Sequence, residues 1–191
     1  QPIAWGAPAN KMPPFVFDVA TTQVAANKLA LTRRIGSKIE PGWIANLDGS
    51  PIMEAVDVPE FGQFKMLPFG GIRENGGHKG YGFAAIADIM SGILSGNGPG
   101  FIADRSYSFF VMAFNVDAFL DVDNFKDDMD KLLHKLANTK PAPGHERVFY
   151  AGLPEHEETE IRQKNGIPYH REVVDWFNSI NSELNLGISM P

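Results

Sequence analysis

The sequence GGHKGYG at residues 76–82 places one histidine and one lysine among four glycines, directly before an apolar run. Glycine lets the backbone approach a ligand closely, and the free amides at a helix start attract anions. Lys79 would add a positive charge beside those amides. A plain helix-entry turn with a solvated lysine has the same spacing. Spacing alone therefore leaves two interpretations open, an anion-binding loop and a simple turn.

A second polar group follows a predicted buried strand. The sequence FVFDVATT at residues 15–22 has Asp18 among apolar residues, followed by Thr21 and Thr22. Such an aspartate is either buried and hydrogen-bonded to backbone amides or displayed at the strand end beside the threonines. A cap for the following turn explains the same pattern equally well.

Several common sites are excluded or disfavoured. No G-x-G-x-x-G follows a strand and no G-x-x-x-x-G-K-[ST] occurs, so Rossmann and P-loop fingerprints are absent. Asp121 and Asp123 lack the glycine and glutamate of a calcium loop, so they predict helix capping instead. HEETE at residues 156–160 lacks the second histidine of a zinc helix. No metal site is expected.

The bulk composition is that of an ordinary globular protein. The 191 residues carry a net charge of −6 without a basic block, which argues against nucleic-acid binding. No apolar run is long enough for a membrane span, and zero cysteines fit a cytoplasmic location. A chain of this length is expected to bury roughly 70% of its unfolded surface in one domain.

The pattern of apolar residues predicts an α/β fold in which a mixed sheet is packed by helices. The opening residues 1–14 hold four prolines and predict extended chain crossing a surface. The central strand is expected at 106–116, because its apolar run suggests cover on both faces. Further strands are expected from Phe15 to Val19 and within 146–152, mainly loops over 37–77, and helices at about 23–35, 81–95, 121–139, 154–166 and 170–186.

Five ordered stretches together resemble the malate/L-lactate dehydrogenase family of type 2, which includes ureidoglycolate, sulfolactate and diketogulonate dehydrogenases. The matching stretches are PIAWGAP, PFVFDVATT, PGWIANLDGSPI, LPFGG and HKGYGFAAIADIMSGILSG, and PGHER follows later. The resemblance implies an NAD(P)-dependent oxidoreductase with a non-Rossmann nucleotide-binding fold.

The resemblance also implies where NAD or NADP binds. The segments VFDVATT and HKG would form the dinucleotide site, and GHER would complete it. On this interpretation the glycine-rich loop cradles the cofactor. The implied cofactor-binding residues are Asp18, Ala20, Thr21, Thr22, His78, Lys79, Gly80, Gly144, His145, Glu146 and Arg147.

The family carries a helical segment ahead of PIAWGAP, and its catalytic histidine and substrate-binding arginine lie there. No catalytic residue can therefore be assigned in this chain, and residues 1–191 are expected to be a single NAD(P)-binding portion of a larger dehydrogenase. Three explanations for the missing helical segment are a cleaved or incompletely described enzyme, a truncated gene product, and one chain of a split enzyme. Gln1, in place of an initiator methionine, favours the first.

The expected reaction interconverts a 2-hydroxy acid, similar to malate or lactate, and its 2-oxo acid. The expected partner is a second copy in a homodimer or the missing N-terminal segment, because the resemblance places the active site between subunits and long loops need cover. The alternative function is a catalytically inactive binding or assembly module that retains the fold.

Overall fold

A computed structural model describes residues 2–102 and 107–188. Its centre is an antiparallel pair of strands, β1 (Pro2–Ala7) and β2 (Phe15–Ala20), with Pro2 opposite Ala20 and Ala7 opposite Phe15. The predicted extended chain is therefore a strand over Pro2–Ala7, which pairs on one side with β2. Proline is tolerated here because Pro2 begins the strand, and the other prolines of residues 1–14 follow it.

A small apolar core lies beside this hairpin. Helix α1 (Ala26–Arg34) packs near a second antiparallel pair, β3 (Ile44–Ala45) and β4 (Lys65–Met66). The buried members of this core are Val24, Leu29, Ile39 and Ile44, and the partly buried side chains packed on them are Trp43, Ile52, Val56, Val58, Phe64 and Met66. Residues 37–77 are otherwise mostly loops, as predicted.

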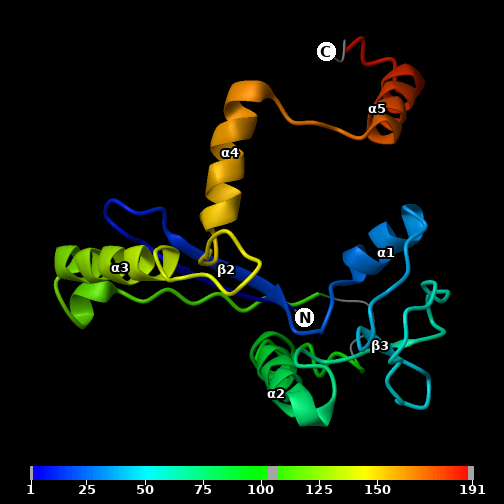
Figure 1. Ribbon diagram of the computed structural model, residues 1–191, viewed down its shortest axis with the longest axis horizontal. Coiled ribbons are helices and arrows are strands. Elements are labelled where there is room, and N and C mark those ends of the chain that lie inside the picture. Colours follow the sequence, from blue (N-terminus) through cyan, green and yellow to red (C-terminus); the bar gives the residue numbers. More distant parts are fainter. Residues whose placement is uncertain (1, 103–106, 189–191) are drawn as a thin grey trace.

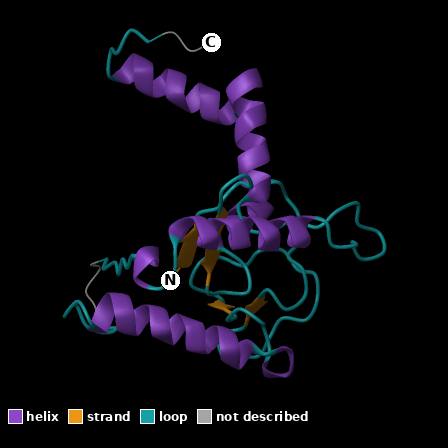
Figure 2. Cartoon of the chain, turned by 90° about the vertical axis from the view of Figure 1, so that its left-hand side faces the viewer, coloured by secondary structure: helices purple, strands orange, loops and turns teal. Residues whose placement is uncertain are grey.

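The helices agree with the apolar periodicity. α2 (Gly77–Asp88) starts four residues earlier than predicted and continues into a π-helical turn, η2 (Ile89–Ile93). Two 3-10 turns, η1 (Arg73–Asn75) and η3 (Val116–Ala118), precede α2 and α3. The later helices are α3 (Val122–Ala137), α4 (Leu153–Asn165) and α5 (Arg171–Glu183). Figures 1 and 2 show α4 and α5 leading away from the hairpin.

The predicted central strand at 106–116 is wrong over its described part. Residue 106 lies outside the described residues, residues 107–115 form neither helix nor strand, and Val116 begins η3. The predicted strand within 146–152 is also absent, although Val16 N donates to Ala151 O at 3.0 Å. Apolar composition favours a strand only where a neighbouring strand can pair with it.

Over residues 2–102 and 107–188, two small antiparallel sheets among helices replace the predicted mixed sheet. The accessible surface is 14368 Å². A compact protein of 21.0 kDa would expose about 9,000 Å². The chain thus buries only about half of its unfolded surface instead of the expected 70%, and many large apolar side chains remain exposed.

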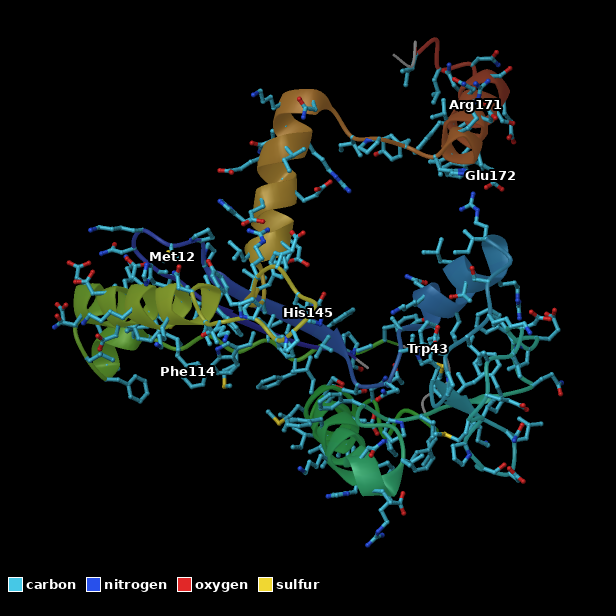
Figure 3. All side chains as sticks on the ribbon, viewed as in Figure 1. Met12, Trp43, Phe114, His145, Arg171 and Glu172 are labelled. Atoms are coloured by element: carbon cyan, nitrogen blue, oxygen red, sulfur yellow. The ribbon has the colours of Figure 1, made fainter. Side chains whose placement is uncertain are left out.

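Two carboxylates of α3 fasten the hairpin loop: Asn10 Nδ2 donates to Asp127 Oδ1 at 2.9 Å, and Asp130 binds three backbone amides. The backbone amides of Asn10, Lys11 and Met12 donate to the carboxylate of Asp130 at 2.9–3.0 Å. Figure 3 shows Met12 beside α3. The amide of Met12 makes the largest contribution to lowering the pKa of Asp130 below its ordinary value. A side chain 120 residues away in the chain thereby fixes the loop between β1 and β2.

We expect Asp130→Ala to lower the melting temperature by several degrees, because three amides lose their acceptor. Since the pKa of Asp130 is lowered in the folded state, its contribution is complete above the ordinary pKa of about 4 and is lost as the pH falls below that value. Thermal unfolding of both proteins between pH 3 and 7 measures the difference.

The matched control is Asp128→Ala on the same helix. Asp128 forms an exposed ion pair with Lys131 at 2.7 Å, and such pairs contribute little to stability. Equal melting temperatures for the two variants at pH 7 would contradict a clamping role for Asp130.

Candidate functional site

The end of β2 is joined to the LPFGG turn by backbone hydrogen bonds. Phe69 N donates to Thr21 O and Gln23 N donates to Leu67 O, each at 2.8 Å. The side chain of Gln23 adds a third link, since its Oε1 accepts from Gly70 N at 2.9 Å. Two segments more than 40 residues apart therefore form one surface. The sequence interpretation missed Gln23, for which no local pattern gives a signal.

The start of α2 is seated on this turn through two glycines. A Cβ atom on Gly80 would lie 2.0 Å from Phe69 O, and one on Gly77 would lie 2.2 Å from Gly71 O. Real Cβ atoms do not approach oxygen so closely, so only glycine permits this packing. The glycines of GGHKGYG thus have a structural role that spacing alone did not reveal.

His78 and Lys79 lie exposed in the first turn of α2. Gly76 precedes the helix with φ of 94°, in the left-handed region that favours glycine, and the Lys79 side chain lies next to it. The helix start has no side-chain cap and no acidic residue in its first turn. Two amides of the first turn are already engaged, since Gly77 N donates to Ile72 O at 2.9 Å and Lys79 N donates to Gly76 O at 2.8 Å. What an anion would meet here is the positive end of the helix dipole and the Lys79 cation.

The polar residues of FVFDVATT lie in different environments. Thr21 is 5% exposed, and Thr22 Oγ1 donates to Val24 O at 2.8 Å. Ala20, the last residue of β2, is half-buried. Asp18 is exposed within β2 and lines an open groove whose other wall includes Tyr150 and His156. The buried interpretation of Asp18 is wrong, because Asp18 is exposed; it lies within β2, two residues before the strand ends at Ala20, rather than at the strand end.

The GHER segment forms a turn before α4. Gly144 has φ of 85°, and His145 N donates to Ala142 O at 3.1 Å. His145 and Glu146 are exposed. Figure 3 shows His145 on the loop that passes near β2.

The guanidinium of Arg147 is already engaged. Its Nη1 donates to Oε1 of Glu157 at 2.9 Å, its Nη2 donates to Oε2, and it lies 4.3 Å above the Phe149 ring. The side-chain hydrogen bond is the largest cause that raises the pKa of Arg147 and lowers that of Glu157. The sequence interpretation missed Glu157, because only the folded turn brings it to Arg147.

The predicted site residues fall into two groups. Thr21 and Thr22 meet the α2 start through the 67–71 turn, whereas Asp18 faces the segment that follows Arg147. Within 2–102 and 107–188, no hydrogen bond or ion pair joins Gly144–Arg147 to His78 or Lys79. The structure thus brings together two of the three predicted segments.

Two kinds of feature are absent from the described part of the chain. No three His, Asp or Glu side chains gather there as a metal site requires. None of the described helices combines the length and apolar character needed to cross a bilayer. Asp121 caps α3 by accepting from Asn124 N at 2.9 Å, which confirms its predicted capping role.

Known proteins match almost the whole chain. Residues 1–178 match the family model for malate/L-lactate dehydrogenase. A malate dehydrogenase from Pyrococcus abyssi is 36% identical over 187 residues, which are 94% of this chain and 51% of that protein. An L-lactate dehydrogenase from Cupriavidus necator is 32% identical over 80% of this chain and 44% of its own length.

A solved structure also resembles the fold of this chain. The crystal structure of malate dehydrogenase from Entamoeba histolytica aligns with a TM-score of 0.82 and 27% identity, covering 100% of this chain and 55% of that one. The chain thus spans about half the length of the relatives it matches. With 178 of its 191 residues matched, the chain belongs to the malate/L-lactate dehydrogenase family.

Proposed function

We propose that this chain supplies the NAD(P)-binding part of a dehydrogenase that interconverts a 2-hydroxy acid and its 2-oxo acid. The observation that carries the proposal is the uncapped start of α2, with Lys79 exposed in its first turn, seated through Gly77 and Gly80 on the surface that includes Thr21. A dinucleotide carries a pyrophosphate, and the positive end of a helix with a cation beside it attracts such a group.

The residues present fit such a group without a Rossmann sheet. The described strands pair only in antiparallel fashion, so the phosphates would meet one helix start rather than the end of a parallel sheet. His78 and Lys79 would contact the phosphates, and Thr21 and Thr22 would line the adjacent wall. Gly144–Arg147 would complete the site, with Arg147 exchanging Glu157 for a ligand oxygen. When bound, NAD or NADP supplies the hydride-transfer chemistry.

The names of several relatives support the proposed substrate class. The related enzymes are named for malate and L-lactate, which are both 2-hydroxy acids. Their oxidation requires a base at the hydroxyl and a cation at the carboxylate. We place those groups in polypeptide that corresponds to the unmatched half of the relatives, so residues 1–191 would bind the cofactor but not complete the reaction.

Fluorescence titration of the purified chain with NADH and NADPH tests the proposal. Saturable binding of either nucleotide, without turnover of malate or lactate, is the expected result. Turnover would show that the catalytic groups lie in this chain. Absence of binding to the folded chain would instead favour a module that retains the fold without the chemistry.

We expect Lys79→Ala to weaken dinucleotide binding roughly ten- to a hundredfold, the effect of losing a hydrogen bond to a charged group. His78→Ala should act in the same direction. Thermal stability should hardly change, because Lys79 is exposed and its removal leaves no cavity. Titration of each variant with the nucleotide that binds the unmodified chain gives the affinity ratio.

Lys164→Ala provides the matched control, because Lys164 is an exposed helical lysine near the end of α4. This variant should bind as the unmodified chain does. If Lys79→Ala also leaves the dinucleotide affinity unchanged, residues 76–82 are a plain helix-entry turn with a solvated lysine.

A further inference from the structure

Three asparagines of this chain directly precede a glycine, namely Asn75, Asn97 and Asn165. In an Asn-Gly pair the backbone nitrogen of the glycine readily attacks the side-chain amide before it, because glycine has no Cβ to restrict the approach. Asparagine is therefore among the thermolabile residues. The fold restrains the three pairs to different degrees, so they are expected to react at different rates.

Asn75 lies in the least restrained of the three pairs. It is exposed and ends η1, a single 3-10 turn of three residues. The turn is held by Asn75 N, which donates to Ile72 O at 3.1 Å, and by Gly76 N, which donates to Arg73 O at 3.0 Å. Hydrogen bonds of a 3-10 turn have poor geometry, and so short an element opens locally at little cost.

The other two pairs are held more firmly. Asn165 is the last residue of α4, a helix of 13 residues, and Gly166 N donates at 2.8 Å to the carbonyl four residues earlier. Asn97 N and Gly98 N both donate to Gly92 O, at 3.1 Å and 3.2 Å. The attack requires the Asn-Gly peptide to rotate out of its hydrogen bonds. We therefore expect the pair that ends η1 to react first.

The reaction consumes only water. The backbone nitrogen of Gly76 loses its proton to solvent and forms a bond to Cγ of Asn75, which closes a cyclic imide. The Cγ–Nδ2 bond breaks, and Nδ2 takes a proton and leaves as ammonia. Water then adds to one of the two imide carbonyls and opens the ring. Addition at Cγ leaves an aspartate at position 75, whereas addition at the main-chain carbonyl leaves an isoaspartate, whose main chain is longer by one methylene.

Either product places a carboxylate close to Lys79. Position 75 lies four residues before Lys79, and an acidic side chain at this spacing pairs with a following lysine along a helix. The Lys79 side chain already lies beside this point, because a Cβ on Gly76 would be 3.5 Å from Lys79 Cδ. A carboxylate at position 75 would thus neutralise the cation that the phosphates of a dinucleotide would meet.

Isoaspartate would in addition displace the start of α2. The backbone of Gly76 packs closely on the LPFGG turn, since a Cβ on Gly70 would lie 2.8 Å from both the carbonyl carbon and the oxygen of Gly76. An additional main-chain methylene one residue earlier must move this contact.

We propose that Asn75 is a deamidation site, and that its conversion to aspartate or isoaspartate weakens dinucleotide binding at the start of α2. The conversion follows from the local geometry and requires no partner, whereas its effect on binding rests on the proposed function.

Ageing of the purified chain at mildly alkaline pH tests the conversion. Trypsin releases residues 74–79, because Arg73 and Lys79 flank them, and mass spectrometry detects the replacement of an amide NH2 by OH in this peptide. We expect residues 74–79 to convert earlier than residues 165–171, the tryptic peptide that carries Asn165. Asn75→Gln is the matched control. Its longer side chain must close a larger and less favourable ring, so residues 74–79 of this variant should stay unmodified.

Asn75→Asp introduces the carboxylate directly and tests the effect on binding. This variant should bind NADH or NADPH roughly five- to tenfold more weakly, because the new charge pairs with Lys79 and repels the phosphates. Its melting temperature should not fall, since an acidic residue before a helix is favoured by the dipole. Asn165→Asp adds the same charge at another exposed Asn-Gly pair and should bind as the unmodified chain does.

Ageing and binding are then combined. The aged unmodified chain should lose affinity in proportion to the converted fraction of residues 74–79, whereas aged Asn75→Gln should keep the affinity that it had when fresh. Proportional loss would assign the change in binding to position 75 rather than to general damage.

Two results would overturn the proposal. One is a peptide of residues 74–79 that stays unmodified on ageing or converts later than residues 165–171. The other is Asn75→Asp binding as tightly as Asn165→Asp. If the fresh unmodified chain binds neither nucleotide, the proposed function and the effect on binding both fail, and the peptide masses still decide whether Asn75 converts.

Discussion

Gly80→Ala should destabilise the chain by about 3 kcal/mol, at the upper end of the effect of overpacking a well-packed contact. The added Cβ would lie 2.0 Å from Phe69 O and 2.6 Å from Phe69 N. Both are backbone atoms, so no flexible side chain can move aside. The start of α2 must shift away from the LPFGG turn, or the turn must break its hydrogen bond to Thr21. Chemical denaturation measures the change in the free energy of unfolding.

Gly82→Ala, two residues further along the same helix, is the matched control. Apart from Gly82, its two chain neighbours and the backbone of its own helix, no atom lies within 4 Å of a Cβ at this position. Replacing a helical glycine with alanine there should raise the free energy of unfolding by about 0.5–1 kcal/mol, because the unfolded chain loses conformational freedom. The two substitutions are chemically identical, yet Gly80→Ala should lower the free energy of unfolding and Gly82→Ala should raise it. Destabilisation of similar size by both would show that helix flexibility, rather than close packing, requires the glycines.

The variants Gly80→Ala and Gly82→Ala also test whether the packing of α2 matters for dinucleotide binding. If α2 must be seated on the turn to present Lys79 and the positive end of the helix to phosphate, Gly80→Ala should lose dinucleotide affinity even at temperatures where the variant remains folded. Gly82→Ala should retain it, because nothing at that position contacts the turn. Titration at low temperature, with circular dichroism to confirm folding, separates loss of the site from loss of the fold.

Local patterns predicted the helices well because their signals are contained within each segment. In α3, Phe125, Met129 and Leu133 repeat at four-residue spacing, and Asp121 caps the start. Leu133 is fully buried, as this periodicity requires. Such a helix needs only one apolar surface to pack on, and its backbone hydrogen bonds are internal.

Strands depend on partners that a local pattern does not contain. The apolar run at 107–115 has the composition of a central strand, yet a strand satisfies its backbone only through a neighbour. Pro2–Ala7 shows the converse, because the register with β2 makes a strand from a proline-containing segment. The ion pair of Arg147 with Glu157 was unpredictable for a similar reason, since the turn at Gly152 sets their distance.

In the motif GGHKGYG, residue types alone predicted some features of the site but not the roles of the individual glycines. The sequence indicated a loop that ends at a helix beginning near Tyr81, whereas the structure places Gly77 to Gly80 in the first turn of α2; the exposed cation Lys79 agrees with the prediction. The sequence did not distinguish glycines that clear space for a ligand from glycines that clear space for protein backbone. Gly77 and Gly80 do the second, whereas the conformation of Gly76 orients the helix start.

Leu29→Ala should cost about 2–5 kcal/mol, the usual range for removing a buried leucine side chain. Leu29 is 0% exposed and lies at the centre of the core formed with Val24, Ile39 and Ile44. Because this core is small, few neighbouring side chains can move to fill the cavity. Urea denaturation gives the change in the free energy of unfolding.

Leu31→Ala, on the exposed face of the same helix, should change stability by no more than about 0.5 kcal/mol, since Leu31 is 55% exposed. Equal effects of the two variants would show that this core does not hold the chain together. The core with Leu29 also supports the candidate site. Val24 belongs to this core and directly follows Gln23, whose side chain and backbone amide are hydrogen-bonded to the LPFGG turn. Loss of the Leu29 side chain should therefore loosen the surface on which α2 is seated, and dinucleotide affinity should fall with stability in Leu29→Ala while remaining unchanged in Leu31→Ala.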